Sequence, residues 1–198
     1  MSKAVIATRN KGKLKELQEL LKDLNLEILP IDAFNVGTIE EDGNSFFENA
    51  MKKAKITAEK TGLLAIADDS GLEVDALDGQ PGIHSARYAG ENASDKENNK
   101  KLLKELDGVE AQRRTARFRC VIVAYRPDGQ FISAEGVCQG RIAEKPAGEH
   151  GFGYDPIFIP EGYQRTMAQL RREEKNKISH RGKALEILKE KITELLQE

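Results

Sequence analysis

The chain has little cysteine, no long apolar run and almost no net charge. No run of apolar residues approaches the ~18 that a membrane-spanning helix needs, so we expect no membrane contact. Residues 1–8 lack the apolar core and cleavage site of a signal peptide, which favours a cytoplasmic location. The two cysteines, Cys120 and Cys138, lie on the two predicted strands of one hairpin, so a disulfide between them is possible, but we expect reduced strand residues in a reducing cytosol. Neither has the spacing of a metal or nucleophile site.

Positive and negative side chains nearly cancel over the 198 residues, leaving a formal net charge of -2. A surface without excess positive charge gives no reason to expect nucleic acid as a partner, although a local pocket could still hold a small anion. Apolar residues make up 39% and charged residues 32%, which is enough for a core and argues against disorder. We therefore expect a single domain over residues 1–198, in one body or two closely packed lobes.

Hydrophobic periodicity predicts an α/β fold. We expect strands at 3–8, 26–31 and 63–67, an antiparallel hairpin of 115–126 with 130–140, and helices at 11–24, 94–106 and 181–197. A further helix carries the apolar stripe from Phe47 to Ala58. Asn10 is the expected N-cap of the first helix, and we expect capping boxes at Ser45–Glu48 and Ser94–Glu97. Parallel βαβ units followed by a hairpin predict a mixed sheet covered by helices.

Two adjacent carboxylates, Asp68 and Asp69, follow the apolar strand 63–67 and precede Ser70 and Gly71. Strand ends in α/β sheets open toward a ligand crevice, and buried carboxylates there need a positive partner. Hard oxygen ligands suit Mg²⁺. The alternative is a polar turn with no ligand, in which these Asp and Ser side chains cap backbone groups.

Two further segments near the N-terminus have the composition of a phosphate and metal site. Residues 8–13 join a strand to a helix, where backbone N–H groups attract phosphate; an ordinary helix cap with solvated lysines is the alternative. The acidic run 40–42 could supply a metal ligand beside Asp68 or Asp69, or could be a solvated turn.

Two segments of the second half have the composition of a base-binding site. In Gly151–Pro156, glycines allow a ligand to approach the backbone closely, and Phe152 offers a face on which a planar base can stack; an apolar turn is the alternative. In 175–183, cations precede the last helix, a placement that the helix dipole slightly disfavours and that mildly favours a ligand; an ordinary basic helix start is the alternative.

In this combination the chain resembles the inosine/xanthosine triphosphate pyrophosphatase (Ham1-like) family. The matching stretches run in family order over almost the whole chain: Thr8-x-Asn10-x-x-Lys13-x-x-Glu16, Glu40-Glu41-x-Gly43-x-Ser45-Phe46-x-Glu48-Asn49-Ala50, Ala67–Leu72, Pro81-Gly82-x-x-Ser85-Ala86-Arg87-Tyr88, Phe152–Pro156 and Ser179-His180-Arg181. The resemblance implies an elongated mixed β-sheet flanked by helices, with two lobes and the active-site cleft between them. It also implies a homodimer that uses Mg²⁺ to convert ITP, dITP and XTP into the monophosphate and pyrophosphate.

The resemblance also implies roles for individual residues. Asp69 is the expected catalytic residue, and Glu40 and Asp69 are the expected Mg²⁺ ligands, with Glu41 and Asp68 in support. The expected substrate-binding residues are Thr8, Arg9, Asn10, Lys11, Gly12, Lys13, Ser70, Phe152, Gly153, Tyr154, Asp155, Lys175, His180 and Arg181. Of these, Phe152 would stack on the base, and Asp155, His180 and Arg181 would make its polar contacts.

Two features depart from the family pattern, namely Arg9 in the phosphate loop and the absence of an acidic residue in Gln169–Arg172. They bear on fine specificity rather than on the reaction. Two alternatives remain at this point. One is a pyrophosphatase for other modified nucleotides. The other is a non-catalytic nucleotide- or RNA-binding module that uses the basic segments 52–60, 96–104 and 171–183.

Overall fold

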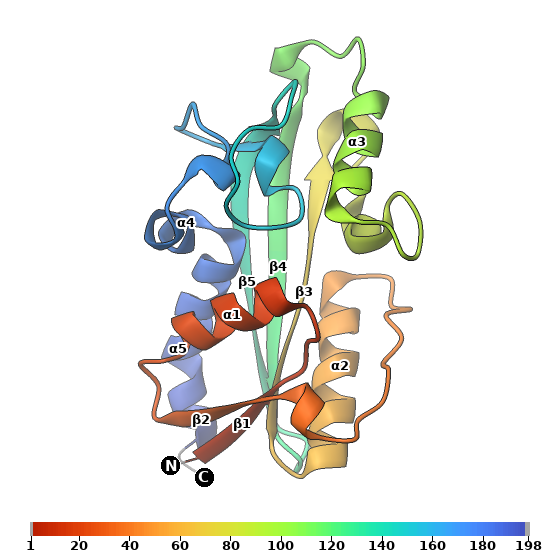
Figure 1. Ribbon diagram of the computed structural model, residues 1–198. Helices are drawn as coiled ribbons and strands as arrows, with labels where there is room; N and C mark the ends of the chain where they lie inside the picture. Colours follow the sequence, from red (N-terminus) through yellow and green to blue (C-terminus); the bar gives the residue numbers. More distant parts are fainter. Residues whose placement is uncertain (1, 197–198) are drawn as a thin grey trace. The chain divides into compact units, whose positions relative to one another are not determined.

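A computed structural model describes residues 2–196, without the side chain of Glu194. The helices and longer strands are β1 (Ser2–Ile6), α1 (Lys11–Leu20), β2 (Leu26–Pro30), α2 (Phe46–Thr61), β3 (Leu64–Val74), α3 (Asp95–Glu105), β4 (Thr115–Tyr125), β5 (Phe131–Ile142), β6 (Phe158–Pro160), α4 (Arg172–Ile178) and α5 (His180–Leu196) (Figure 1). Within this range no helix is both long and apolar enough to cross a membrane. Residue 197, the expected end of the last helix, lies outside the described residues.

The strands form one mixed sheet in the order β2-β1-β3-β4-β5-β6. β1 runs parallel to both β2 and β3, whereas β5 and β6 are antiparallel. A tight turn joins β4 to β5, and in it Arg126 N–H donates to Gln130 O at 2.8 Å. The predicted mixed sheet flanked by helices is therefore confirmed, and so is the hairpin.

The chain divides into two compact units: unit 1 comprises Met1–Asp69, Cys120–Gly136 and Arg181–Glu198, and unit 2 comprises Ser70–Arg119 and Val137–His180. Each unit has its own apolar core. The predicted cleft between two lobes stays a prediction.

In unit 1, α1 and α5 pack on one face of the strands. The core there contains Leu17 of α1 and Leu21 directly after it, Leu185 and Leu188 of α5, and Ile66 of β3. In Figure 1, α2 lies on the other side of these strands from α1 and α5. Because side chains alternate along a strand, β1 and β3 can bury residues against helices on both faces.

In unit 2, the core surrounds a pair of aromatic rings, with Phe118 of β4 and Phe158 of β6 at a centroid distance of 4.5 Å. Leu102 of α3, Leu72 of β3 and Met167 are buried with them. This core holds α3 and the loop 143–157, which carries Phe152 and Asp155 of the predicted base-binding residues.

Three expectations about local structure need correction. α1 ends at Leu20 rather than at residue 24, because the next residues form turns in which Leu24 N–H donates to Leu21 O. β3 continues to Val74 instead of ending at residue 67, because pairing with β4 extends it through residues of low strand propensity. Ser45 caps α2 as expected, but the Glu48 carboxylate accepts from Asn44 N–H rather than from Ser45 N–H.

The other capping predictions are confirmed. Asn10 caps α1, and Ser94 and Glu97 form a complete capping box at the start of α3. Both cysteines are strand residues outside any disulfide, as expected, and both are buried.

Candidate active site

The start of α1 is fixed by its own cap. Asn10 Oδ1 accepts from the backbone N–H groups of Gly12 at 2.9 Å and Lys13 at 3.1 Å, and Asn10 N–H donates to Thr8 Oγ1 at 3.2 Å. The Arg9 side chain donates to Asp32 Oδ1 and to Gly37 O, so the departure from the family pattern at this position ties the loop to a later segment of unit 1. The loop therefore holds a defined conformation in which Lys13 lies at the beginning of the helix.

Lys13 belongs to a group of charged side chains in unit 1 that we call the Asp68–Asp69 cluster. It comprises Lys13, Glu16, Glu41, Asn49, Lys53, Asp68, Asp69 and Arg181. Parallel pairing of β1 with β3 ends at Ile66, so the two aspartates follow directly where β1 stops. Both carboxylates therefore lie at the C-terminal end of the paired strands β1 and β3, as the sequence indicates. β3 continues beyond this point to Val74.

Asp68 is the fully buried centre of the cluster. Its Oδ2 accepts from Arg181 Nη2 at 3.1 Å and lies 3.2 Å from Lys13 Nζ. Its Oδ1 has no hydrogen-bond partner among the described residues. Burial favours the neutral acid, but the positive charges of Lys13, Arg181 and Lys53 outweigh burial and hold the pKa of Asp68 below its usual value. Asp68 is therefore ionised.

Arg181 is also fully buried, with its guanidinium bonded to Asp68 and Glu16. Burial favours its neutral form, yet the charges of Asp68 and Glu16 raise its pKa further. Five fixed donors suit the guanidinium to joining two carboxylates. The structure places this side chain inside unit 1, and its predicted contact with the base stays a prediction.

α2 supplies two polar residues from its buried face. Lys53 Nζ donates to Glu41 Oε1 at 2.5 Å and to the backbone oxygen of Asp68 at 2.7 Å. Burial lowers the pKa of Lys53, but the charges of Glu41, Asp69 and Asp68 more than reverse this, so the ammonium is retained. One turn earlier, Asn49 Nδ2 donates to Asp69 Oδ2 at 3.0 Å.

Asp69 differs from its neighbour. Its residue is 4% exposed, and burial raises its pKa even though Lys53 and Lys13 act in the opposite direction. A carboxylate with a raised pKa is a better proton acceptor than an unperturbed one. A nearby cation also stabilises its ionised form more strongly, because burial has removed water from it.

The donor set of the cluster is chemically compatible with a hard divalent cation such as Mg²⁺. Among the described residues, no three His, Cys, Asp or Glu side chains form a ready-made metal site. Mg²⁺ does not need one, because it keeps several waters and is commonly held by one or two carboxylates plus substrate phosphates. Within the described part of the chain, the cluster holds four carboxylates against three cations and gives Asp68 Oδ1 no hydrogen-bond donor, a charge balance that favours a further cation. Glu40 is exposed in the loop directly before Glu41.

In unit 2, the loop 151–155 joins an aromatic ring to a buried ion pair. Asp155 Oδ2 accepts from Lys175 Nζ at 2.6 Å and from the backbone N–H of Phe152 at 3.0 Å. Lys175 Nζ also lies 4.8 Å from the centroid of the Phe152 ring, within cation–π range. Gly151 permits this packing, since a Cβ there would lie 2.0 Å from Asp155 Oδ2 and φ is +76°. Three predicted base-binding residues therefore meet.

Helix α3 holds the same loop from the other end. Gly153 N–H donates to Asp95 Oδ2 at 2.7 Å, and Gly153 O accepts from Asn99 Nδ2 at 3.0 Å. Tyr154 is buried and donates from its hydroxyl to Ser85 O at 2.7 Å. The sequence predicted a base-binding role for Tyr154; the structure gives its hydroxyl a backbone partner inside unit 2.

His180 stacks on Phe118 at a centroid distance of 4.7 Å and an interplanar angle of 14°. Its residue is 5% exposed, so the ring orientation is set by packing. Ser70, the predicted phosphate ligand that follows Asp69, is partly exposed. It is the first residue of β3 that belongs to unit 2.

The sequence analysis missed the parts that Glu16, Asn49 and Lys53 take in the cluster. A signal was available for α2, because Asn49 and Lys53 recur with Ala50, Ala54 and Ala58 on one helical face. A polar residue on a buried helix face requires a partner, which is the Asp69 carboxylate for Asn49, and the Glu41 carboxylate and the Asp68 backbone oxygen for Lys53. The basic segment 52–60 therefore contains a lysine that serves an internal ion pair rather than a solvated surface.

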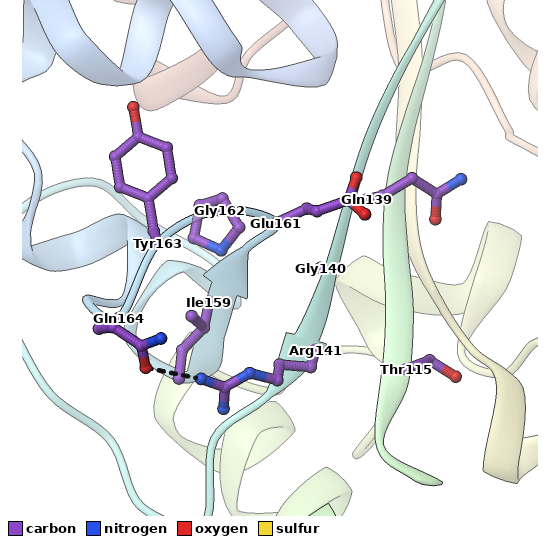
Figure 2. Close-up of a pocket in the computed structure, with 10 residues that line it drawn as sticks. Thr115, Gln139, Gly140, Arg141, Ile159, Glu161, Gly162, Tyr163 and Gln164 are labelled. Carbon is purple, nitrogen blue, oxygen red and sulfur yellow. Dashed lines mark hydrogen bonds between the residues drawn. The ribbon is translucent and has the colours of Figure 1, made fainter. Parts of the chain in front are cut away.

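An open pocket of about 490 Å³ lies beside β5 and β6 in unit 2. Figure 2 shows it lined by Arg141 of β5, Ile159 of β6 and Gln164 after it, with Arg141 Nη2 donating to Gln164 Oε1 at 3.2 Å. None of the predicted site residues lines this pocket. The size of this pocket alone does not identify it as the active site.

Comparison with known proteins identifies the family to which the chain belongs. The model of the Ham1 family matches residues 4–191, and the chain belongs to this family. A dITP/XTP pyrophosphatase from Desulforamulus reducens is 57% identical over 184 residues, covering 92% of each chain, and one from Nitratidesulfovibrio vulgaris is 55% identical over 199 residues, covering 96% of each. The structure of a HAM1 protein from Coxiella burnetii superimposes with a TM-score of 0.89 at 47% identity, covering 98% of this chain and 100% of that one.

Proposed function

We propose that this chain is a metal-dependent nucleoside triphosphate pyrophosphohydrolase. It converts ITP, dITP and XTP into the monophosphate and pyrophosphate and so removes deaminated purines from the nucleotide pool. The observation that carries the proposal is the Asp68–Asp69 cluster, in which a buried carboxylate with a raised pKa lies among lysines beside the start of α1. The names of relatives with 47–57% identity support the same reaction.

The residues of unit 1 would act on the triphosphate. Lys13 and the backbone of residues 8–13 would bind phosphate oxygens, and Ser70, the first residue of unit 2, would add a hydroxyl. Asp69 and Glu40 would hold Mg²⁺, with Glu41 and Asp68 in support, and the ion when bound would supply positive charge that stabilises the leaving pyrophosphate. Asp69 orients the attacking water and accepts its proton. Positioning contributes most of the rate, because a carboxylate is a weak base even with a raised pKa.

The loop 151–155 would bind the base. Phe152 supplies the stacking face, and Lys175 and Asp155 hold that ring and its backbone in place. His180 and Arg181 donate to the 6-oxo group of hypoxanthine or xanthine. Adenine carries a 6-amino donor there, so each donor left unpaired would cost about 1–3 kcal/mol.

The direct test incubates the purified protein and Mg²⁺ with ITP, dITP, XTP, ATP and GTP in turn and identifies the phosphate product. We expect pyrophosphate, mainly from ITP, dITP and XTP, and only a residual trace from an Asp69→Asn variant that keeps the wild-type circular dichroism spectrum. Orthophosphate as the product would contradict the reaction. Equal turnover of ATP would contradict the base selectivity and favour a pyrophosphatase of wider range.

We further propose that residues 1–198 act as a single domain, as a homodimer, in the cytoplasm. Light scattering after size exclusion would give twice the 22.0 kDa of one chain for a dimer. A measured mass equal to that of one chain would contradict the proposed homodimer but not the proposed reaction.

A further inference from the structure

The amide of Asn49 is engaged at both ends. Its Oδ1 accepts from the backbone N–H of Gly43 at 2.8 Å, and its Nδ2 donates to Asp69 Oδ2 at 3.0 Å. Only one orientation of the amide satisfies both partners, because one is a donor and the other an acceptor. With its residue 1% exposed, Asn49 has no room to exchange these contacts for water.

The surrounding backbone holds this amide in place. Asn49 lies in the first turn of α2, where its N–H donates to Ser45 O at 3.2 Å. Gly43 packs against it so closely that a Cβ would lie 2.7 Å from Asn49 Oδ1. Asn49 thus joins three segments: the loop that contains the acidic run 40–42 and Gly43, the start of α2, and Asp69 of β3.

We propose that Asn49 is a positioning residue for Asp69. This inference rests on the proposed function, in which Asp69 orients and deprotonates the attacking water. Asn49 holds one carboxylate oxygen of Asp69 and thereby fixes the plane of the whole group, while the acidic loop fixes Asn49. Its contribution is made through the aspartate and not through substrate binding.

Two variants separate this role from packing. Asn49→Ala removes both contacts, whereas Asn49→Asp keeps an acceptor for Gly43 N–H and places an oxygen against the Asp69 carboxylate. We expect kcat for ITP to fall about 10- to 100-fold in both, as for loss of a hydrogen bond to a charged group, with KM little changed. Ser45→Ala is the matched control: it removes the 3.1 Å bond to Glu48 N–H at the same helix start, and we expect a lower Tm with wild-type kcat.

A double-mutant cycle decides whether Asn49 acts through Asp69. If it does, adding Asn49→Ala to Asp69→Asn lowers the residual kcat no further. A second loss of the same 10- to 100-fold size would overturn the proposal and assign Asn49 a separate role. If Asp69→Asn alone keeps its activity, the proposed function fails instead, so the two failures are distinct.

A reversed pair covers the case in which Asn49→Ala does not fold. Combining Asn49→Asp with Asp69→Asn lets an amide at 69 donate to a carboxylate at 49, which can still accept from Gly43 N–H. We expect this double variant to recover most of the Tm lost in Asn49→Asp and to remain inactive. Recovery of activity along with Tm would mean that the pair is structural only.

Discussion

Replacing Asp68 by asparagine keeps the shape of the side chain and removes its charge from the centre of the Asp68–Asp69 cluster. Arg181 and Lys13 both contact Asp68 Oδ2, and Arg181 is fully buried, so neither cation regains full hydration when its partner is neutral. Breaking a buried ion pair on one side costs about 3–5 kcal/mol. We expect Asp68→Asn to lower the free energy of unfolding by that amount at pH 7, and Tm by roughly 6–20 °C for a chain of this length.

The pH dependence gives this prediction a second readout. The folded pKa of Asp68 lies below its unfolded value of about 3.9, so its contribution is complete above that value and is lost as pH falls toward the folded pKa. The difference between wild type and variant should therefore be constant from pH 7 to about pH 5. By pH 3 it should have narrowed by about 1 kcal/mol.

Urea unfolding followed by far-UV circular dichroism measures both effects, provided that the m-value is unchanged. Glu27→Gln is the control, because the exposed Lys3–Glu27 pair at 3.5 Å should contribute only about 0.2–1 kcal/mol. A loss below about 1 kcal/mol for Asp68→Asn at pH 7 would refute the argument. So would a difference that does not change between pH 5 and pH 3.

Three further predictions concern other parts of the molecule. Phe152→Ala should raise KM for ITP about tenfold or more by removing the stacking face, and an unchanged KM would exclude this ring from base binding. Gly151→Ala should disrupt the contact of Asp155 with its lysine partner, since the added Cβ falls 2.0 Å from the carboxylate; a wild-type KM and Tm would contradict this. In native protein, Cys120 and Cys138 should both resist a thiol reagent and react only in denaturant, because both are buried and burial raises the pKa of Cys120 to about 12. Rapid labelling of the native protein would show that the interior opens.

Local signals in the sequence were sufficient where the physics is local. Asn10 and Ser94 cap their helices as expected, since a side chain bonds a backbone group only two or three residues away. The stripe of α5 is buried because its spacing of three and four residues places it on one helical face. Strand boundaries were predicted less well, because the length of β3 depends on β4, which lies some fifty residues later.

The sequence by itself determined the α/β class, the mixed sheet, the helix caps and the family, because periodicity and the motifs are read directly from neighbouring residues. Only the tertiary structure decided which charges meet. Arg181 reaches Asp68 and Glu16 across more than a hundred residues, and Lys53 reaches Glu41 and the backbone of Asp68. Ion pairs between distant segments leave no spacing in the sequence, since they depend on how helices and strands pack. The same packing made Asp69 a buried carboxylate with an amide on one oxygen.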